Sequence, residues 1–362
     1  MSAVLATLRR RLSPARFLIG NGMPYHGRRG WNLALVLLIV ATGAWATAES
    51  PDFLTFHYLF DAVEGAAVSA LLALGLTVVV IIGEIDISLT SNLALCTVAA
   101  GMLGQAGAPA ALIVIASLLV GGALGFINGA LVGYLGLPSL AVTLGALGAY
   151  QALAFIIGGH AGFTAFPPAI SALGFGAVGA VPVSLIVFLA VAAAVSVVLN
   201  LTTIGRTFYA IGRNPEATRR TGISVPFGRT IAFVVAGLVA GLAALVFVGF
   251  YGSGGGDSAA GTILTVVTIV ALGGVDIYGG SGQISGVVLA ALLLLTIQSG
   301  MALLNLSTTV QTIVIGALLV LSLAASEIMG GGAWRRGLAR SLARLRPASG
   351  GPEGGASPGG GE

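Results

Sequence analysis

The sequence contains no lysine, only one cysteine and few charged residues for its length. Only 8% of the 362 residues are charged, whereas about a quarter are charged in soluble globular domains. All sixteen basic residues are arginine, and a phosphate-binding Walker loop needs a lysine before its Ser or Thr. The chain therefore cannot be its own ATPase of that class. Cys96 has no second thiol, which excludes a disulfide framework and a thiolate metal site.

Histidines are also too few and too scattered to suggest a metal centre. His26, His57 and His160 lie far apart, and no pair has the spacing of metal ligands on one helix. We predict no metal site. The basic pI of about 9.6 is explained by membrane topology and attraction to anionic lipid heads, without nucleic acid as a partner.

Long apolar runs account for most of the chain, since 57% of its residues are hydrophobic. Each of ten runs is about long enough to cross a hydrocarbon core of ~30 Å. The sequence therefore predicts an all-α fold, a polytopic membrane helical bundle of about ten transmembrane helices. The predicted spans are residues 31–48, 65–83, 89–107, 109–135, 138–158, 178–201, 230–251, 259–273, 282–304 and 307–326.

Arginines fall into three clusters, at residues 9–29, 206–229 and 335–346. Basic clusters that flank spans mark the cytoplasmic side, so both termini and the central cluster are predicted to be cytoplasmic. Six spans before the central cluster and four after it agree with this orientation. The predicted organisation is a basic N-terminal segment (1–30), a transmembrane domain (31–329) with a coupling loop (202–229), and a basic surface helix with a disordered tail (330–362).

The central loop carries the signals of a short helix of about two turns. Asn214 is suited to cap it, Pro215 to the first helical position, and Glu216 to the positive end of the helix dipole. Gly222 can end the helix. Because so short a helix is marginal in water, the neighbouring spans or another protein must hold it.

This loop also carries a resemblance to a known family. Glu216 to Gly222, with the pattern Glu-Ala-Thr-x-x-x-Gly, resembles the Glu-Ala-Ala…Gly loop of ABC importer permeases. The longer run from Gly205 to Ala217 resembles the sugar-permease branch, typified by the ribose permease. Thr218 replaces the usual second alanine. Residues 83–88 (GEIDIS), 126–129 (FING) and 137–145 (LPSLAVTLG) are similar to segments of the same family.

The resemblance implies a permease subunit in the inner membrane of a bacterium, with both termini cytoplasmic. Its expected partners are a cytoplasmic ATPase, a second permease subunit (identical or different), a periplasmic solute-binding protein and membrane lipid. ATP would be used by the ATPase, so we expect no catalytic residue and no cofactor in this chain. The expected coupling residues are Arg213, Asn214, Pro215, Glu216, Ala217, Arg219, Arg220 and Gly222.

Two segments centred on acids form an internal repeat, residues 83–91 around Asp86 and residues 273–281 around Asp276. The predicted topology places both on the same side, as in a parallel repeat. An acid at membrane depth is a functional candidate, although each Asp could simply cap a helix. Asn128, Gln151 and Gln298 either line a path for a polar solute or hydrogen-bond between helices.

Charge is nearly absent from the spans that would form this path. Between Asp86 and Arg206 there is no Asp, Glu, Lys or Arg. A zwitterion at membrane depth needs opposite charges, whereas hydroxyls need only amides, hydroxyls or water. The predicted cargo is thus a monosaccharide or similar neutral polar solute. The alternatives are a branched-chain amino-acid permease, an importer of a furanose-like autoinducer, an intramembrane enzyme and a passive channel.

Overall fold

A computed structural model describes residues 25–159 and 161–329, and it is built almost entirely of helices. The first half contains α3 (Tyr25–Glu49), η1 (Pro51–Leu54), α4 (Phe56–Ile81), α5 (Leu89–Gln105), α6 (Ala110–Gly133), α7 (Ser139–Gly158), α8 (Pro168–Phe175), and the strands β1 (Ala177–Val178) and β2 (Val181–Pro182). The second half contains α9 (Val183–Leu201), α10 (Thr203–Arg213), α11 (Pro215–Arg220), α12 (Val225–Tyr251), α13 (Ile263–Leu272), α14 (Ile284–Leu303) and α15 (Thr308–Met329). The all-α bundle is confirmed. The predicted C-terminal surface helix and tail, and most of the N-terminal basic segment, lie outside the described residues.

Each of the ten predicted spans corresponds to a helix, but only eight helices of the described chain are long and apolar enough to cross a membrane. The two that fall short are α5, with 17 residues, and α13, with 10. At 1.5 Å per residue, α13 covers about 15 Å, half of a hydrocarbon core of ~30 Å. The count of ten full spanning helices is therefore not confirmed.

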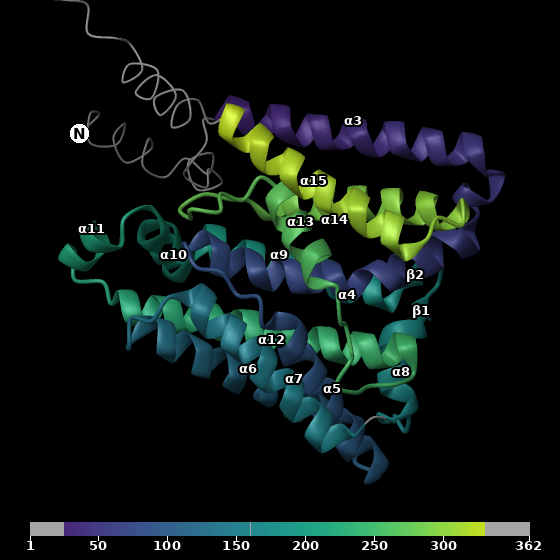
Figure 1. The fold of residues 1–362 in the computed structure, drawn as a ribbon, viewed down its shortest axis with the longest axis horizontal. Helices are drawn as coiled ribbons and strands as arrows, with labels where there is room; N and C mark the ends of the chain where they lie inside the picture. The colour runs from purple at the N-terminus through teal and green to yellow at the C-terminus, as the bar shows by residue number, and fades with distance from the viewer. Residues whose placement is uncertain (1–24, 160, 330–362) are drawn as a thin grey trace, which may run out of the picture.

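The bundle has two distinct ends (Figure 1). The helices α10 and α11 lie at one end, and α8 with the β1–β2 hairpin lies at the other. The hairpin pairs Val178 with Val181 and occupies the start of the predicted span 178–201, so α9 begins only at Val183. The central arginine cluster lies at the α11 end.

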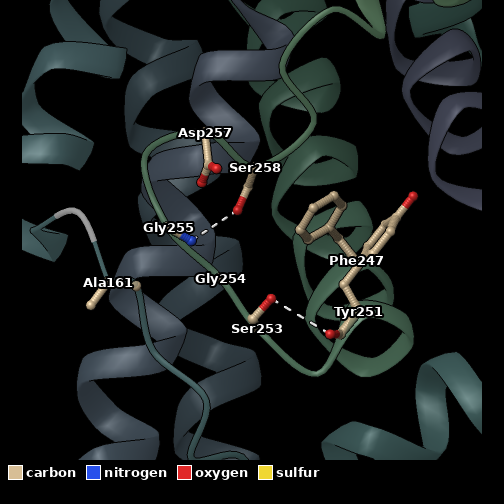
Figure 2. A pocket seen from close by; sticks show the side chains of 9 residues that line it. Ala161, Phe247, Tyr251, Ser253, Gly254, Gly255, Asp257 and Ser258 are labelled. Carbon is tan, nitrogen blue, oxygen red and sulfur yellow. Dashed lines mark hydrogen bonds between the residues drawn. The ribbon is translucent and has the colours of Figure 1, made fainter. Parts of the chain in front are cut away.

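Irregular chain accompanies both short helices. Residues 82–88 link α4 to α5, and residues 252–262 link α12 to α13. The second link contains Gly252 and Gly261 at positive φ, and also Ala259 at φ 57°, a conformation that costs a non-glycine residue energy. Part of this link, from Ser253 to Ser258, is seen from close by in Figure 2. Such backbone is tolerated at membrane depth only where protein or water satisfies its polar groups.

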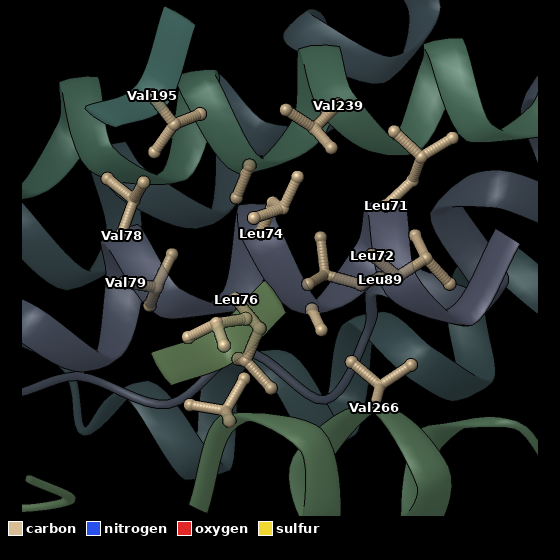
Figure 3. Packing of buried hydrophobic residues seen from close by; sticks show 14 of the residues in the cluster. Leu71, Leu72, Leu74, Leu76, Val78, Val79, Leu89, Val195, Val239 and Val266 are labelled. Carbon is tan, nitrogen blue, oxygen red and sulfur yellow. The ribbon is translucent and has the colours of Figure 1, made fainter. Parts of the chain in front are cut away.

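The core surrounds α4, whose second half is buried almost without interruption. Figure 3 shows Leu71, Leu74 and Val78 of this helix among side chains from neighbouring elements, including Val239 of α12 and Val266 of α13. By contrast, α3, α7 and α15 leave most of their apolar surface uncovered. The second half of α4 is therefore the centre of the bundle, with protein around it.

Close helix contact depends on glycine along one pair of helices. The backbone of α6 at Gly121, Gly125 and Gly129 meets the backbone of α12, and a Cβ added at Gly129 would lie 2.8 Å from Thr230 Cα. The hydroxyl of Thr230 donates to Gly129 O at 3.0 Å. Small residues permit this approach in a membrane, where no hydrophobic force drives helices together.

Candidate coupling and translocation site

The central polar segment forms the predicted short helix, now seen as α11. The Asn214 side chain accepts from the Ala217 backbone N–H at 2.9 Å, and Pro215 occupies the first turn. Gly222 has φ +83° beyond the last turn, and its N–H donates to Arg219 O at 3.0 Å. Each local signal in the sequence therefore acts in the expected place.

The outer surface of α11 is charged and exposed. Glu216 lies 3.6 Å from Arg219 and 3.4 Å from Arg220, both on its own helix. These pairs are exposed to water, so each contributes little to stability. Ala217 is exposed as well, whereas Thr218 is buried and its hydroxyl donates to Asn214 O at 2.9 Å. The exposed side of α11 is thus available to another protein.

The helix α10 is amphipathic and connects α9 to α11. It was not predicted from the sequence. It begins at Thr203, after Thr202, whose hydroxyl accepts from the Gly205 N–H at 3.2 Å. Its buried side carries Phe208 and Ile211. Phe208 and Ile211 are three residues apart, the spacing of neighbours on one helix face, so part of the signal was present in the sequence. The predicted loop 202–229 therefore contains two helices and the first turn of α12.

Glycines form the contact between α10 and the rest of the bundle. We call Gly83, Gly212, Gly279 and Gly280 the glycine junction. A Cβ added at Gly212 would collide with Ile81 O and Gly280 N, and one added at Gly279 would lie 2.6 Å from Gly83 Cα. The Gly280 N–H donates to Ile81 O at 2.7 Å. Three segments distant in sequence, the end of α4, the end of α10 and the link after α13, therefore meet backbone to backbone.

Side-chain contacts that precede and follow α11 in the sequence hold the same region together. Before it, Arg213 Nε donates to Gly280 O at 3.3 Å and the Tyr209 hydroxyl donates to Gly282 O at 2.9 Å. After it, Arg229 Nε lies 2.8 Å from Glu84 Oε1, in a pair that is mostly shielded from water. Arg213, predicted as a coupling residue, thus contacts the permease itself. Displacement of α11 would strain contacts on both of its flanks.

The two repeat segments lie at the same end of the bundle and touch at Gly83 and Gly279. Asp86 Oδ1 accepts from the Ser88 N–H at 2.9 Å, and Asp276 Oδ1 accepts from the Tyr278 N–H at 3.0 Å. Each Asp therefore closes a tight turn of the same kind. The segments differ in surroundings, because Asp86 is buried and Asp276 is exposed.

A buried chain of hydrogen bonds leads away from Asp86 between three elements. The Tyr150 hydroxyl donates to Asn128 Oδ1 at 2.8 Å, Asn128 Nδ2 donates to Ser88 Oγ at 2.8 Å, and Ser88 Oγ donates to Asp86 Oδ1 at 2.6 Å. Asp86 and Asn128 are each only 1% exposed. Burial raises the pKa of the Asp86 carboxyl to about 6, and the hydrogen bonds from Ser88 oppose that shift. With every member paired, this network rigidifies the contact of α5 with α6 and α7.

The five predicted pathway residues do not form one site. Asp86 and Asn128 meet in the buried network, while Asp276 lies in the exposed link beside the glycine junction. Gln151 Nε2 donates to Gly256 O at 2.9 Å and so supports the link between α12 and α13. Gln298 is half-buried in α14, towards the other end of the bundle from Asp276.

Sequence reasoning missed Tyr150, Ser88 and the pairing of Arg229 with Glu84. The contact of Ser88 with Asp86 is local, whereas the contacts of Asn128 with Tyr150 and Ser88, and of Arg229 with Glu84, join segments far apart in the sequence and have no local signal. The arrangement provides an exposed short helix whose flanking residues Arg213 and Arg229 contact the two repeat segments, one of which joins a buried polar network through Asp86.

Comparisons with known proteins identify the family of the chain. A family model described as branched-chain amino acid transport system / permease component matches residues 58–323. Proteins named autoinducer 2 import system permease protein LsrD, from Escherichia coli (strain K12) and Shigella flexneri, are 33% identical to this chain over 310 residues. The match covers 81% of this chain and 91% of theirs. No solved structure matches. The chain therefore belongs to the family of ABC importer permease components, as a multi-pass membrane transport subunit.

Proposed function

We propose that this permease imports a small neutral solute rich in hydroxyl groups, with energy from a separate cytoplasmic ATPase. The observation that carries the proposal is the exposed helix α11, held on both flanks by contacts with the glycine junction and Glu84. A helix of six residues has no stability of its own, so these contacts keep it folded for docking. Force applied to α11 would reach the repeat segments through Arg213 on one flank and Arg229 on the other.

The expected partners follow from this role. The ATPase would dock on the exposed Glu216, Ala217, Arg219 and Arg220, a binding protein would deliver the solute to the opposite end, and a second permease subunit would complete the pathway. The uncovered apolar surfaces of α3, α7 and α15 would face lipid or that subunit. In this orientation, the α11 end and both termini are cytoplasmic.

Two observations support the nature of the solute. The described bundle has its only mostly shielded ion pair, Arg229 with Glu84, at the α11 end, so no comparable pair is present to meet a zwitterion. The relatives named above are import permeases for autoinducer 2, a name that points to a small solute. A branched-chain amino acid is the second candidate, favoured by the description of the family model.

The docking proposal is tested with Glu216→Gln in the purified importer complex. Removal of this exposed charge is expected to weaken ATPase association or to uncouple hydrolysis from uptake, because Glu216 stabilises the start of α11 and lies on its docking surface. Asp61→Asn is the matched control, since Asp61 is an exposed helical acid that also pairs with a residue one turn away, His57 at 3.6 Å.

Equal loss of uptake in both variants would contradict a specific role for α11, as would normal coupling in Glu216→Gln combined with Gly222→Pro. The solute is tested with labelled D-ribose, L-fucose and leucine in proteoliposomes that contain the complete system. Uptake of leucine without either sugar would refute the proposed solute class.

A further inference from the structure

A cavity of about 290 Å³ lies at the end of the bundle opposite α11. Its walls are the link after α12, with Ser253, Asp257 and Ser258, the end of α12, with Phe247 and Tyr251, and the loop at Gly162. Tyr251 is the last residue of α12, a helix of 27 residues, so the cavity is separated from α11 by about 40 Å along that helix. Figure 2 shows the link between the Ala161 segment and the two aromatic side chains.

Hydrogen bonds within the protein hold this link in place and occupy the backbone N–H groups of Gly254 and Gly255. The Gly255 N–H donates to Ser258 Oγ at 2.9 Å, and the Gly254 N–H donates to Phe163 O at 2.9 Å. Thr97 supports the same turn through Ser258 Oγ at 3.1 Å, from α5. A ligand in this cavity therefore meets no free backbone N–H from Gly254 or Gly255, which removes the usual means of holding an anion.

Acceptors, in contrast, remain available. Among the described residues, the Asp257 carboxylate has neither an ion-pair partner nor a hydrogen-bond donor. No arginine occurs between Arg229 and Arg335, so the link itself and the helices that follow supply no cation to neutralise it. A carboxylate or phosphate would be repelled by Asp257. Hydroxyl groups would donate to it, and a carboxylate can accept from two neighbouring hydroxyls at once.

The aromatic wall suits the other side of such a ligand. Phe247 and Tyr251 lie with ring centroids 4.4 Å apart, one turn of α12 from each other. Their rings provide an apolar surface against which the C–H face of a small ring can lie, and the Tyr251 hydroxyl adds a polar tip. The volume is close to the lower limit of about 300 Å³ for small-molecule pockets, which favours one small ring over a longer molecule.

We propose that this cavity is a contact site for the transported solute, and that Asp257 selects neutral polyols by accepting from adjacent hydroxyls while Tyr251 covers the ring. The inference rests on the proposed function, because it assigns the place where the same solute is recognised on entry. The proposal also gives the irregular link between α12 and α13 a role, which is to expose the Asp257 carboxylate at the end of the bundle opposite α11.

The first test is Asp257→Asn in the complete importer, which keeps the side-chain shape and removes the charge. For labelled D-ribose or L-fucose, whichever the unchanged protein transports, we expect KM to rise about tenfold or more with kcat unchanged, as for loss of a charge-assisted hydrogen bond. In Asp61→Asn, KM and basal ATPase activity are expected to stay the same. Asp61→Asn is the control.

The second test measures occupancy without transport. Ser253→Cys and the control Thr55→Cys, each in a Cys96→Ser background, are labelled with an impermeant thiol reagent from the binding-protein side. The transported sugar is expected to protect Ser253→Cys and not Thr55→Cys. This protection should be reduced at least tenfold in apparent affinity when Asp257→Asn is added.

The outcomes separate the two proposals. If neither sugar is transported by the unchanged protein, the proposed solute class fails. If sugar is transported but Asp257→Asn keeps its KM and Ser253→Cys is not protected, the cavity assignment alone fails. Protection by labelled putrescine rather than by sugar would show that Asp257 selects cations, which would also overturn the inference.

Discussion

Replacement of Gly212 by alanine is expected to disrupt the contact between α10 and the repeat segments. The added methyl group would collide with Ile81 O and Gly280 N, the two atoms joined by the 2.7 Å hydrogen bond of the glycine junction. Both are backbone atoms, so no side chain can rotate away, and the segments must separate by on the order of 1 Å to restore ordinary contact. Arg213, the next residue, would lose its place against Gly280.

Two opposing terms set the size of the effect. Alanine is favoured over glycine within a helix by about 1 kcal/mol. Overpacking costs about 1–3 kcal/mol, and the lost hydrogen bond costs about 1 kcal/mol. The clash therefore exceeds the gain in helix propensity, and the expected net loss is about 1–3 kcal/mol, with a fall in Tm of a few degrees. Because the site lies beside α11, sugar uptake per ATP hydrolysed should fall as well.

Thermal unfolding of the purified permease and uptake by the reconstituted complex measure these effects. Gly145→Ala and Gly148→Ala are matched controls on α7, where an added Cβ meets nothing within 4 Å. Both controls should leave Tm unchanged or raise it slightly, because only the propensity term applies. A Tm and an uptake-to-hydrolysis ratio for Gly212→Ala equal to those of the controls would refute the role of the glycine junction.

Two further predictions concern pairs on different helices. A double-mutant cycle with Glu84→Gln and Arg229→Gln is expected to give a coupling free energy of about 1–2 kcal/mol in denaturant unfolding, because the pair is mostly shielded from water; additive effects would mean that the pair stabilises nothing. Tyr150→Phe should cost about 1 kcal/mol, and Asn128→Leu more, about 2–3 kcal/mol, because it leaves two buried partners unpaired. Equal losses would argue against a continuous network.

The sequence by itself determined the features that depend on local chemistry. Apolar runs predicted where the helices lie, because a backbone in lipid must satisfy its own hydrogen bonds. The two ends of α11 were predicted because Asn214, Pro215 and Gly222 each act within one or two turns of their own positions in the sequence. The amphipathic pattern of α10 was equally local, and it was overlooked because the arginines around it dominate the segment.

Only the tertiary structure decided how these elements meet. The links 82–88 and 252–262 contain Glu84, Asp86 and Asp257 beside glycine and serine, so composition marks an interruption in each apolar run. Only the tertiary structure decided where α5 and α13 begin and end beside these links. Gly83, Gly212 and Gly280 meet in the glycine junction, and Glu84 pairs with Arg229. These partners are far apart in the sequence, and no periodic pattern connects them. Asp86 and Asn128 were both candidates, yet their connection through Ser88 depends on the crossing of α5 and α6. Contacts of this kind are fixed by packing, which a single sequence does not display.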